Sequence, residues 1–238
     1  MYGNINILLI IQILVQYNRY CELYIIHKQK WDNNMATKQT INTTVFNYDK
    51  GDFPTLTKEQ VEALNKVTII FGDITKVPCD AIVNSASPNL LGGKGVDGDI
   101  HKVAGPKLKK ECSTLGGCLT GEAKITKGYK LPCKYVIHTV GPVFNQNTIE
   151  ENNEKLYNCY YNSIKLASEY KLKSITFPAI STGVFGFPTR LALPVVLTAV
   201  STALCEFDNI KHVNLICHNP INHAAYTSYL KGLIEANS

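Results

Sequence analysis

The chain has 238 residues, a length that favours one domain of ordinary size with a short extension over two domains. Hydrophobic residues make up 45% and charged residues 18%, which is typical of a globular protein that buries a core without disulfides or metals. The formal charge of +5 would suit a phosphorylated ligand, but the lysines are scattered and only Lys107, Lys109 and Lys110 cluster, so we expect no nucleic-acid partner.

Residues 1–50 are predicted to be an N-terminal extension, and residues 51–238 the folded domain. Ile5–Val15 is strongly apolar but too short to span a bilayer comfortably, so we do not expect a membrane partner. No Lys or Arg precedes this segment and no small-residue cleavage site follows it, so it would make a poor signal peptide. Because Met35 offers a second plausible start, residues 1–34 are either a peripheral extension or an artefact of the gene model. A membrane-associated segment is the remaining alternative.

From residue 57 onward, short apolar strands alternate with helices. Thr57–Gln60 has the pattern of a capping box and begins a short helix. The predicted strands are Val67–Phe71, Asp80–Val83, Ala123–Thr126, Tyr135–Val140, Ser174–Phe177 and Val213–Cys217. The further predicted helices are Asp97–Ala104, Pro106–Leu115, Glu150–Tyr170, one within Thr189–Phe207, and Asn222–Ile234.

This alternation predicts an α/β fold, with a largely parallel or mixed sheet and helices on both faces. Right-handed crossovers place ligands at the carboxyl ends of the strands, so the loops that follow strands are the candidate functional segments. Pro194 falls inside a predicted helix, where it costs about 3 kcal/mol unless it lies in the first turn or kinks the helix.

The eight cysteines form no Cys-x-x-Cys pair, so we expect no structural zinc site. Cys159, Cys205 and Cys217 lie within apolar runs and are predicted to be core thiols. This use of cysteine favours a reducing compartment, in the cytoplasm or the nucleus. Asp97 and His101 do not share a helix face with Asp99, so we expect no metal site and no cofactor.

The loop Leu90–Gly98 follows the second predicted strand and begins a helix. Its glycines Gly92, Gly93 and Gly95 allow positive φ angles and a close approach of a ligand to the backbone. Successive N–H groups at a helix N-terminus can bind an anion, and Lys94 could add charge. A tight turn without ligand is the alternative.

A second loop of this kind, Ser181–Phe187, follows the strand that ends at Phe177. Two glycine-containing loops at neighbouring strand ends could hold opposite sides of a diphosphate. Phe185 could contact a ribose or a base, whereas Phe187 is expected in the core.

Gly72-Asp73-Ile74-Thr75 follows the first strand. A carboxylate at this point can accept a hydrogen bond from an adenine amino group, while the next backbone N–H donates to a ring nitrogen. The alternative is that Asp73 caps a helix or turn.

Taken together, these segments resemble the macrodomain family, specifically its MacroD-type branch of ADP-ribosyl hydrolases. The resemblance covers about Val67 to Ile234. The matching strings are Gly72–Thr75, Asp80–Asn84, Leu90–His101, Thr120–Ala123, Tyr135–Pro142 and Phe177–Gly183.

The resemblance implies a three-layer α/β/α fold that binds ADP-ribose. It implies that Asp73 contacts the adenine, that Ile74 supplies a backbone contact, and that Asn84 and Asp97 lie near the distal ribose with His101 one turn further along the helix. The implied phosphate loops are formed by Gly93, Lys94, Gly95 and Val96, and by Ser181, Thr182, Gly183, Val184 and Phe185.

In that branch the reaction is hydrolysis at the distal ribose, of mono-ADP-ribosyl esters on acidic side chains or of O-acetyl-ADP-ribose. The resemblance thus implies ADP-ribose, O-acetyl-ADP-ribose or ADP-ribosylated proteins as partners, and we expect a monomer. Asp97 is the candidate base or water-orienting carboxylate, with Asn84 and His101 beside it. The alternatives are a non-catalytic ADP-ribose reader and an ADP-ribose 1″-phosphate phosphatase.

The sequence departs from the family pattern at the proposed catalytic end. Ser87 replaces the asparagine that usually contacts the distal ribose, and serine is shorter and has no amide donor. Losing one such contact typically costs about 1 kcal/mol. Phe185 stands where many members carry tyrosine, and Lys94 interrupts what is often an all-glycine run. Ser87 therefore keeps the reader alternative open, while Asp97 favours an enzyme.

Overall fold

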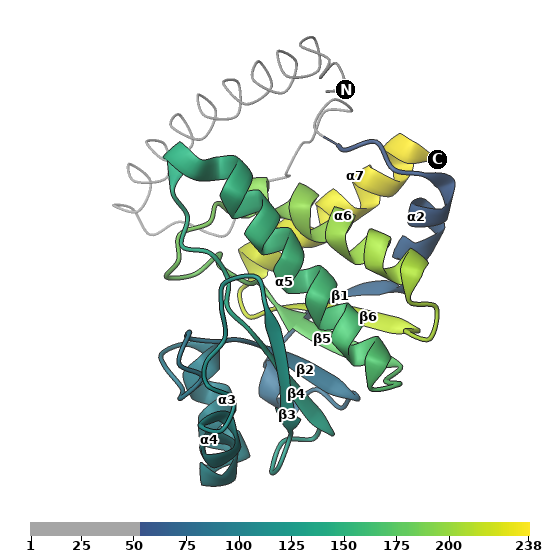
Figure 1. Ribbon diagram of the computed structural model, residues 1–238. Helices are drawn as coiled ribbons and strands as arrows, with labels where there is room; N and C mark the ends of the chain where they lie inside the picture. The colour runs from purple at the N-terminus through teal and green to yellow at the C-terminus, as the bar shows by residue number, and fades with distance from the viewer. Residues whose placement is uncertain (1–52) are drawn as a thin grey trace, which may run out of the picture. The chain divides into compact units, whose positions relative to one another are not determined.

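The computed structural model describes residues 53–238, so the predicted N-terminal extension lies outside the described residues. A six-stranded sheet with the order β1-β6-β5-β2-β4-β3 forms the centre of the fold (Figure 1). Neighbouring strands run parallel except for the β3–β4 pair, as the alternation of strands and helices predicted. The strands are β1 (Val67–Phe71), β2 (Ala81–Ser85), β3 (Ala123–Lys127), β4 (Tyr135–Thr139), β5 (Ser174–Pro178) and β6 (His212–Cys217).

The helices agree with the predicted ones to within a few residues at their ends. They are α2 (Lys58–Ala63), α3 (Val96–Ala104), α4 (Pro106–Cys112), α5 (Ile149–Glu169), α6 (Thr189–Glu206) and α7 (Pro220–Asn237). The capping box at Thr57 is confirmed, because its hydroxyl accepts from the Gln60 N–H and the Gln60 side chain accepts from the Thr57 N–H. α7 begins two residues earlier than predicted, with Asn219 as its N-cap and Pro220 in its first turn.

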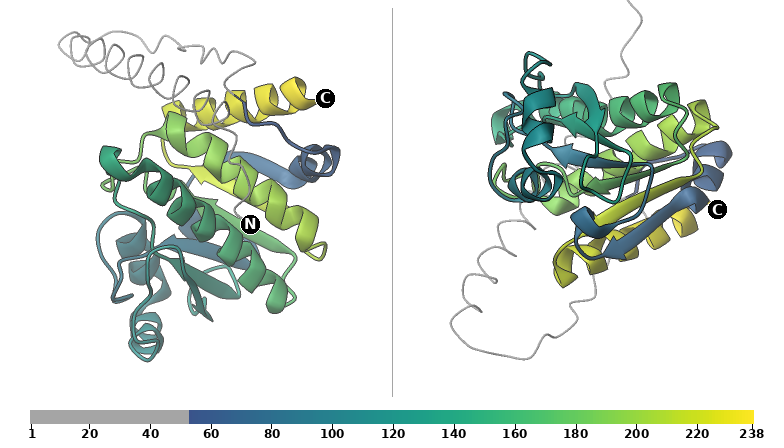
Figure 2. Two further views of the ribbon diagram at one scale, coloured as in Figure 1. Left: turned by 45° about the horizontal axis from the view of Figure 1, so that its top comes forward. Right: turned by 90° about the horizontal axis from the view of Figure 1, so that it is seen from below.

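The side chains of the strands divide between two apolar layers. In β2, Val83 contributes to the cluster that contains α5 and α6, whereas Ile82 points to the cluster that contains α3 and α4. This alternation is the period of a strand that is covered on both faces. The left view of Figure 2 shows α5 and α6 side by side along one face of the sheet.

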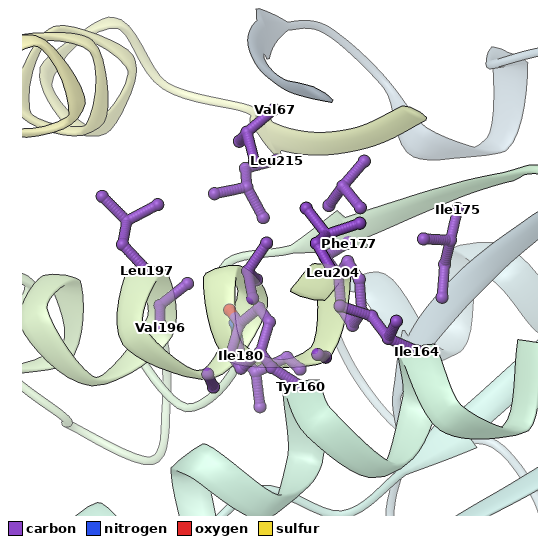
Figure 3. Packing of buried hydrophobic residues seen from close by; sticks show 14 of the residues in the cluster. Val67, Tyr160, Ile164, Ile175, Phe177, Ile180, Val196, Leu197, Leu204 and Leu215 are labelled. Atoms are coloured by element: carbon purple, nitrogen blue, oxygen red, sulfur yellow. The ribbon is translucent and has the colours of Figure 1, made fainter. Parts of the chain in front are cut away.

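The larger core cluster lies between the sheet and the helices α5 and α6 (Figure 3). Tyr160 of α5 stacks on Phe177 of β5 with ring centroids 4.8 Å apart. Phe187 is buried, as expected. Cys159 and Cys217 are buried, as predicted. The prediction for Cys205 is wrong: this residue follows the buried pair Ala203 and Leu204 on α6, and its side chain is exposed.

Helix α6 is the most apolar of the helices among the described residues. By length and composition alone it could cross a membrane, as many core helices of globular proteins could. Half of its apolar stretch is buried inside the domain. Pro194 is the sixth residue of this helix, which continues to Glu206. Pro194 thus lies beyond the first turn, where a proline lacks the N–H that would bond the preceding turn.

Leu197 tests this description of the core, because it is fully buried in the cluster on α6. We expect Leu197→Ala to lower the free energy of unfolding by about 2–5 kcal/mol, since it removes apolar contacts and leaves a cavity. Leu119→Ala is the matched control, because Leu119 is 71% exposed, and it should change the same quantity by less than about 0.5 kcal/mol. Urea denaturation measures both, and equal losses would contradict the placement of α6.

Candidate functional site

A cavity of about 1060 Å³ opens at the carboxyl ends of β1, β2, β5 and β6. Its walls come from the loops that follow these four strands, as expected for a parallel α/β sheet. The lining residues are Phe71, Gly72, Asp73, Ile74, Ser85, Ala86, Ser87, Lys94, Gly95, Val96, Asp97, Asp99, Pro178, Ala179, Ser181, Thr182, Gly183, Val184, Phe185, Ile216, His218, Asn219 and Asn222.

The N-terminus of α3 forms one wall of the cavity. Gly95 is its N-cap, with φ 61° and ψ −140°, a conformation that side chains disfavour, and no side chain caps the helix. The first-turn N–H groups of Val96 and Asp97 therefore have no intrahelical acceptor. Both residues line the cavity. Such a helix end attracts an anion.

The loop after β5 forms the opposite wall. Ser181 adopts φ 63°, a left-handed conformation that is strained for a serine, and its buried hydroxyl has no hydrogen-bond partner. A Cβ on Gly141 would lie 2.2 Å from this hydroxyl, so Gly141 is needed for the loop to pass. Gly183 and Val184 are exposed at the rim. A ligand with hydrogen-bond acceptors would satisfy the Ser181 hydroxyl.

Asp73 is both a cap and a residue of the cavity wall. One oxygen of its carboxylate accepts from the Thr75 N–H at 2.9 Å and from the Thr75 hydroxyl at 2.7 Å. These hydrogen bonds lower the pKa of Asp73, with Lys76 3.4 Å from its second oxygen as a smaller cause. The capping alternative therefore holds, and the side chain, 47% exposed, lines the cavity as well.

Asp97 is a buried carboxylate fixed by hydrogen bonds to both of its oxygens. The Asn84 amide donates to Oδ1 at 2.8 Å, and the Ser87 hydroxyl and N–H donate to Oδ2 at 3.0 and 3.2 Å. Ser87 thus contributes a donor to Asp97 that the sequence did not indicate. Gly93 does not line the cavity but lets these groups approach, since a Cβ there would lie 2.7 Å from Ser87 Oγ and 3.0 Å from Asp97 Oδ2.

Two histidines lie behind Asp97. His101 Nε2 is 3.5 Å from Asp97 Oδ1, but neither ring nitrogen of His101 makes a hydrogen bond, and burial lowers the pKa of this histidine despite the nearby carboxylate. His138 is fully buried in β4, and burial lowers its pKa to about 3. Both rings are therefore neutral at neutral pH.

His101, Cys112 and His138 place three potential metal-ligand atoms within 4.8 Å of one another. The sequence did not indicate this group, because its members come from α3, α4 and β4. Both ring nitrogens of His138 already have protein partners, Asn84 at 3.1 Å and Thr126 at 2.8 Å. Burial also raises the pKa of the Cys112 thiol to about 11. The group thus has the chemistry of a neutral polar cluster more than that of a metal centre.

The structure brings most of the predicted site residues to the cavity wall. Three lie elsewhere: Asn84 and His101 are behind Asp97, and Gly93 is packed beneath it. The wall also contains residues that the sequence did not single out for a role, among them Phe71 and Asn222. Phe71 lies at a strand end and is 59% exposed, and this exposure, which the sequence does not reveal, is what marks it as a possible ligand contact.

The burial of His138 predicts how stability depends on pH. The unfolded chain takes up a proton at this histidine below pH 6.5, whereas the folded chain does not until about pH 3. The unfolded state then binds more protons, so the free energy of unfolding should fall on the order of 1 kcal/mol per pH unit as the pH drops from 6.5 toward 5. Denaturation at several pH values measures this slope. His138→Asn should reduce it, and an unchanged slope would contradict the assignment.

Comparisons with known proteins agree with this fold and cavity. The sequence profile of the Macro domain matches residues 83–196. The chain is 51% identical over 156 residues to a Macro domain-containing protein of Methanosarcina mazei, covering 66% of this chain and 83% of that protein. It is 52% identical over 143 residues to ADP-ribose glycohydrolase MACROD1 of Bos taurus, covering 60% of this chain and 44% of that protein.

Solved structures extend the similarity to three dimensions. The Oceanobacillus iheyensis macrodomain with ADP matches with a TM-score of 0.67 and 41% identity, over 72% of this chain and 94% of that one. The Trypanosoma brucei macrodomain in complex with ADP-ribose matches with a TM-score of 0.64 and 40% identity, over 71% of this chain and 70% of that one. Because the chain is 51% identical to a Macro domain-containing protein of which it covers 83%, and matches solved macrodomains with TM-scores of 0.67 and 0.64, it belongs to the macrodomain family.

Proposed function

We propose that the domain binds ADP-ribose and hydrolyses mono-ADP-ribosyl esters on proteins, O-acetyl-ADP-ribose, or both. The observation that carries the proposal is the position of Asp97, a buried carboxylate at the first turn of α3 that also lines the cavity. A relative named as an ADP-ribose glycohydrolase, and structural neighbours solved with ADP or ADP-ribose, support the ligand and the type of reaction.

The ligand would extend across the strand ends from β1 to β2. Asp73 would accept a hydrogen bond from the adenine amino group, and the Ile74 N–H would donate to a ring nitrogen. The pyrophosphate would lie between the N-terminus of α3 and the loop around Ser181, whose unpaired hydroxyl would donate to it. The distal ribose would then lie beside Asp97.

In this arrangement Asp97 would accept a hydrogen bond from the attacking water and orient it. The carbon–oxygen bond of the ester breaks, and the products are ADP-ribose and the free acid. The donors on both oxygens of Asp97 fix its direction, which supports positioning of the water as its main contribution. A phosphate oxygen of the substrate could share the proton, so a strong protein base would not be needed.

We propose that the reaction needs no metal ion. The three residues that could bind a metal together, His101, Cys112 and His138, are all absent from the cavity wall that Asp97 lines. Metal dependence is therefore tested by including a chelator in every assay below.

A non-catalytic reader is the second candidate, and Ser87 favours it. This residue lines the cavity beside Asp97 without the amide donor that the family usually carries there. An ADP-ribose 1″-phosphate phosphatase would use the same cavity, and incubation with ADP-ribose 1″-phosphate would identify it by the release of inorganic phosphate.

We also propose that the protein acts as a monomer in the cytoplasm or the nucleus. In the part of the chain that the structure describes, the seven cysteines are unpaired thiols, and five of them are buried. This use of cysteine fits a reducing compartment.

The hydrolase proposal predicts that Asp97→Ala releases ADP-ribose from a protein mono-ADP-ribosylated on acidic side chains at least about 100-fold more slowly than the wild type, because the water loses its acceptor. ADP-ribose affinity should change far less. Asp208→Ala, in an exposed loop between α6 and β6, is the matched control and should act as the wild type.

Chromatographic detection of free ADP-ribose, with and without a chelator, measures the rates. Binding without release by the wild type would support the reader instead. Equal release by Asp97→Ala would refute the role of Asp97, and loss of activity with the chelator would refute metal independence.

Ser87→Asn tests whether the departure at this position limits turnover. Asparagine would supply an amide donor toward the distal ribose, so we expect kcat for the same substrate to rise several-fold, in line with a hydrogen bond of about 1 kcal/mol. Ser87→Ala, which removes the donor to Asp97 Oδ2, should lower kcat instead. If all three proteins turn over at one rate, residue 87 does not contribute to the reaction.

A further inference from the structure

Asp97 is connected to the interior by a row of buried side chains on three adjacent strands. Asn84 on β2 and His138 on β4 are register partners in the sheet, so their side chains lie next to each other on the face covered by α3 and α4. Asn84 Nδ2 is 2.8 Å from Asp97 Oδ1 and 3.1 Å from His138 Nδ1. His138 Nε2 is 2.8 Å from the hydroxyl of Thr126 on β3.

The donors and acceptors of this row fit only one arrangement. An ionised Asp97 can only accept hydrogen bonds, so the Asn84 amide must present its NH₂ group to it. The second hydrogen of that group points to His138 Nδ1, which must therefore be unprotonated. The ring proton then resides on Nε2 and is donated to Thr126, whose own hydroxyl has the Val136 carbonyl at 3.5 Å.

The opposite tautomer of His138 would break the row. A proton on Nδ1 would face the Asn84 NH₂ group, and the amide would have to turn over to accept it. The amide oxygen would then face the Asp97 carboxylate, where two acceptors repel each other. Because burial keeps His138 neutral, no second ring proton arises at ordinary pH to force this change.

We infer that His138 is a positioning residue, which fixes the Asn84 amide and thereby the direction of the Asp97 carboxylate. Thr126 accepts from the other ring nitrogen of His138 and holds the ring in place. This inference rests on the proposed hydrolase function. His138 is absent from the cavity wall, and its hydrogen-bonded connection to Asp97 runs through Asn84.

Two substitutions of His138 separate positioning from packing. In His138→Asn, a side-chain oxygen can replace Nδ1 as the acceptor for Asn84, whereas in His138→Gln the amide reaches toward Thr126 and the acceptor for Asn84 is lost. We expect kcat to fall about tenfold in His138→Gln and less in His138→Asn, with the affinity for ADP-ribose unchanged in both. A packing role predicts the reverse order, because glutamine is closer to histidine in volume.

Thr126→Val gives a second test in a variant of nearly the same shape. It removes the hydroxyl that accepts from His138 Nε2–H and leaves the Cys112 sulfur, 3.6 Å from that nitrogen, as a weaker partner. The ring is then held less firmly, so kcat should fall, while Thr126→Ser should keep most of it. His212→Gln, on an exposed position of β6, is the control and should act as the wild type. Equal kcat values for wild type, Thr126→Val and His138→Gln would overturn the inference.

Nitrogen NMR of the wild-type imidazoles tests the arrangement without any assay of activity. The expected result is a neutral His138 with its proton on Nε2. A proton on Nδ1 in the wild type would overturn the inference even if the hydrolase proposal held. A wild type without turnover would instead refute the hydrolase proposal, and with it the role assigned to His138.

Discussion

The parallel course of β1, β6, β5 and β2 is the constraint on which the rest of the structure depends. Because these strands point the same way, the loops that leave them open at one edge of the sheet. Segments far apart in the sequence, such as Asp73 and Ser181, thereby come to line one cavity. Two of these loops bring unpaired hydrogen-bond donors to the same cavity, where we propose that they bind a diphosphate.

A second constraint is the burial of Asp97. A carboxylate that is taken out of water needs donors, and Asn84 and Ser87 supply them to its two oxygens. This need extends into the sheet, because the amide nitrogen of Asn84 also contacts His138 Nδ1. The close approach of Ser87 to Asp97 also explains the glycine at position 93, since a larger residue there would collide with both side chains. Asp97 therefore connects the packing of the sheet with the proposed reaction.

Much of this could be predicted from the sequence, for physical reasons. The strands are apolar enough, and the helices amphipathic enough, that periodicity locates them. The rule that ligands bind at strand ends then selects the loops at Asp73, Gly95 and Ser181. Cys205 shows the limit of this approach, because a position one residue away from the buried face of α6 is exposed even within an apolar run.

The contacts around Asp97 could not be predicted, because they depend on register and on side-chain direction. The residues Asn84, Thr126 and His138 meet only because β2, β4 and β3 are adjacent in the sheet. The resemblance implied that Asn84 lies near the distal ribose, whereas the structure places it behind Asp97 and outside the cavity wall. Ser87 was apparent as a missing asparagine, but its bond to Asp97 follows from a turn geometry that composition does not reveal.

The central claim is that the cavity is built for ADP-ribose, and calorimetric titration of the full chain with ADP-ribose tests it most directly. The account predicts saturable binding at one site, weakened about tenfold by Asp73→Ala through the loss of the adenine contact and unaffected by Asp208→Ala. Absence of binding to the wild type, or equal binding by Asp73→Ala, would contradict it.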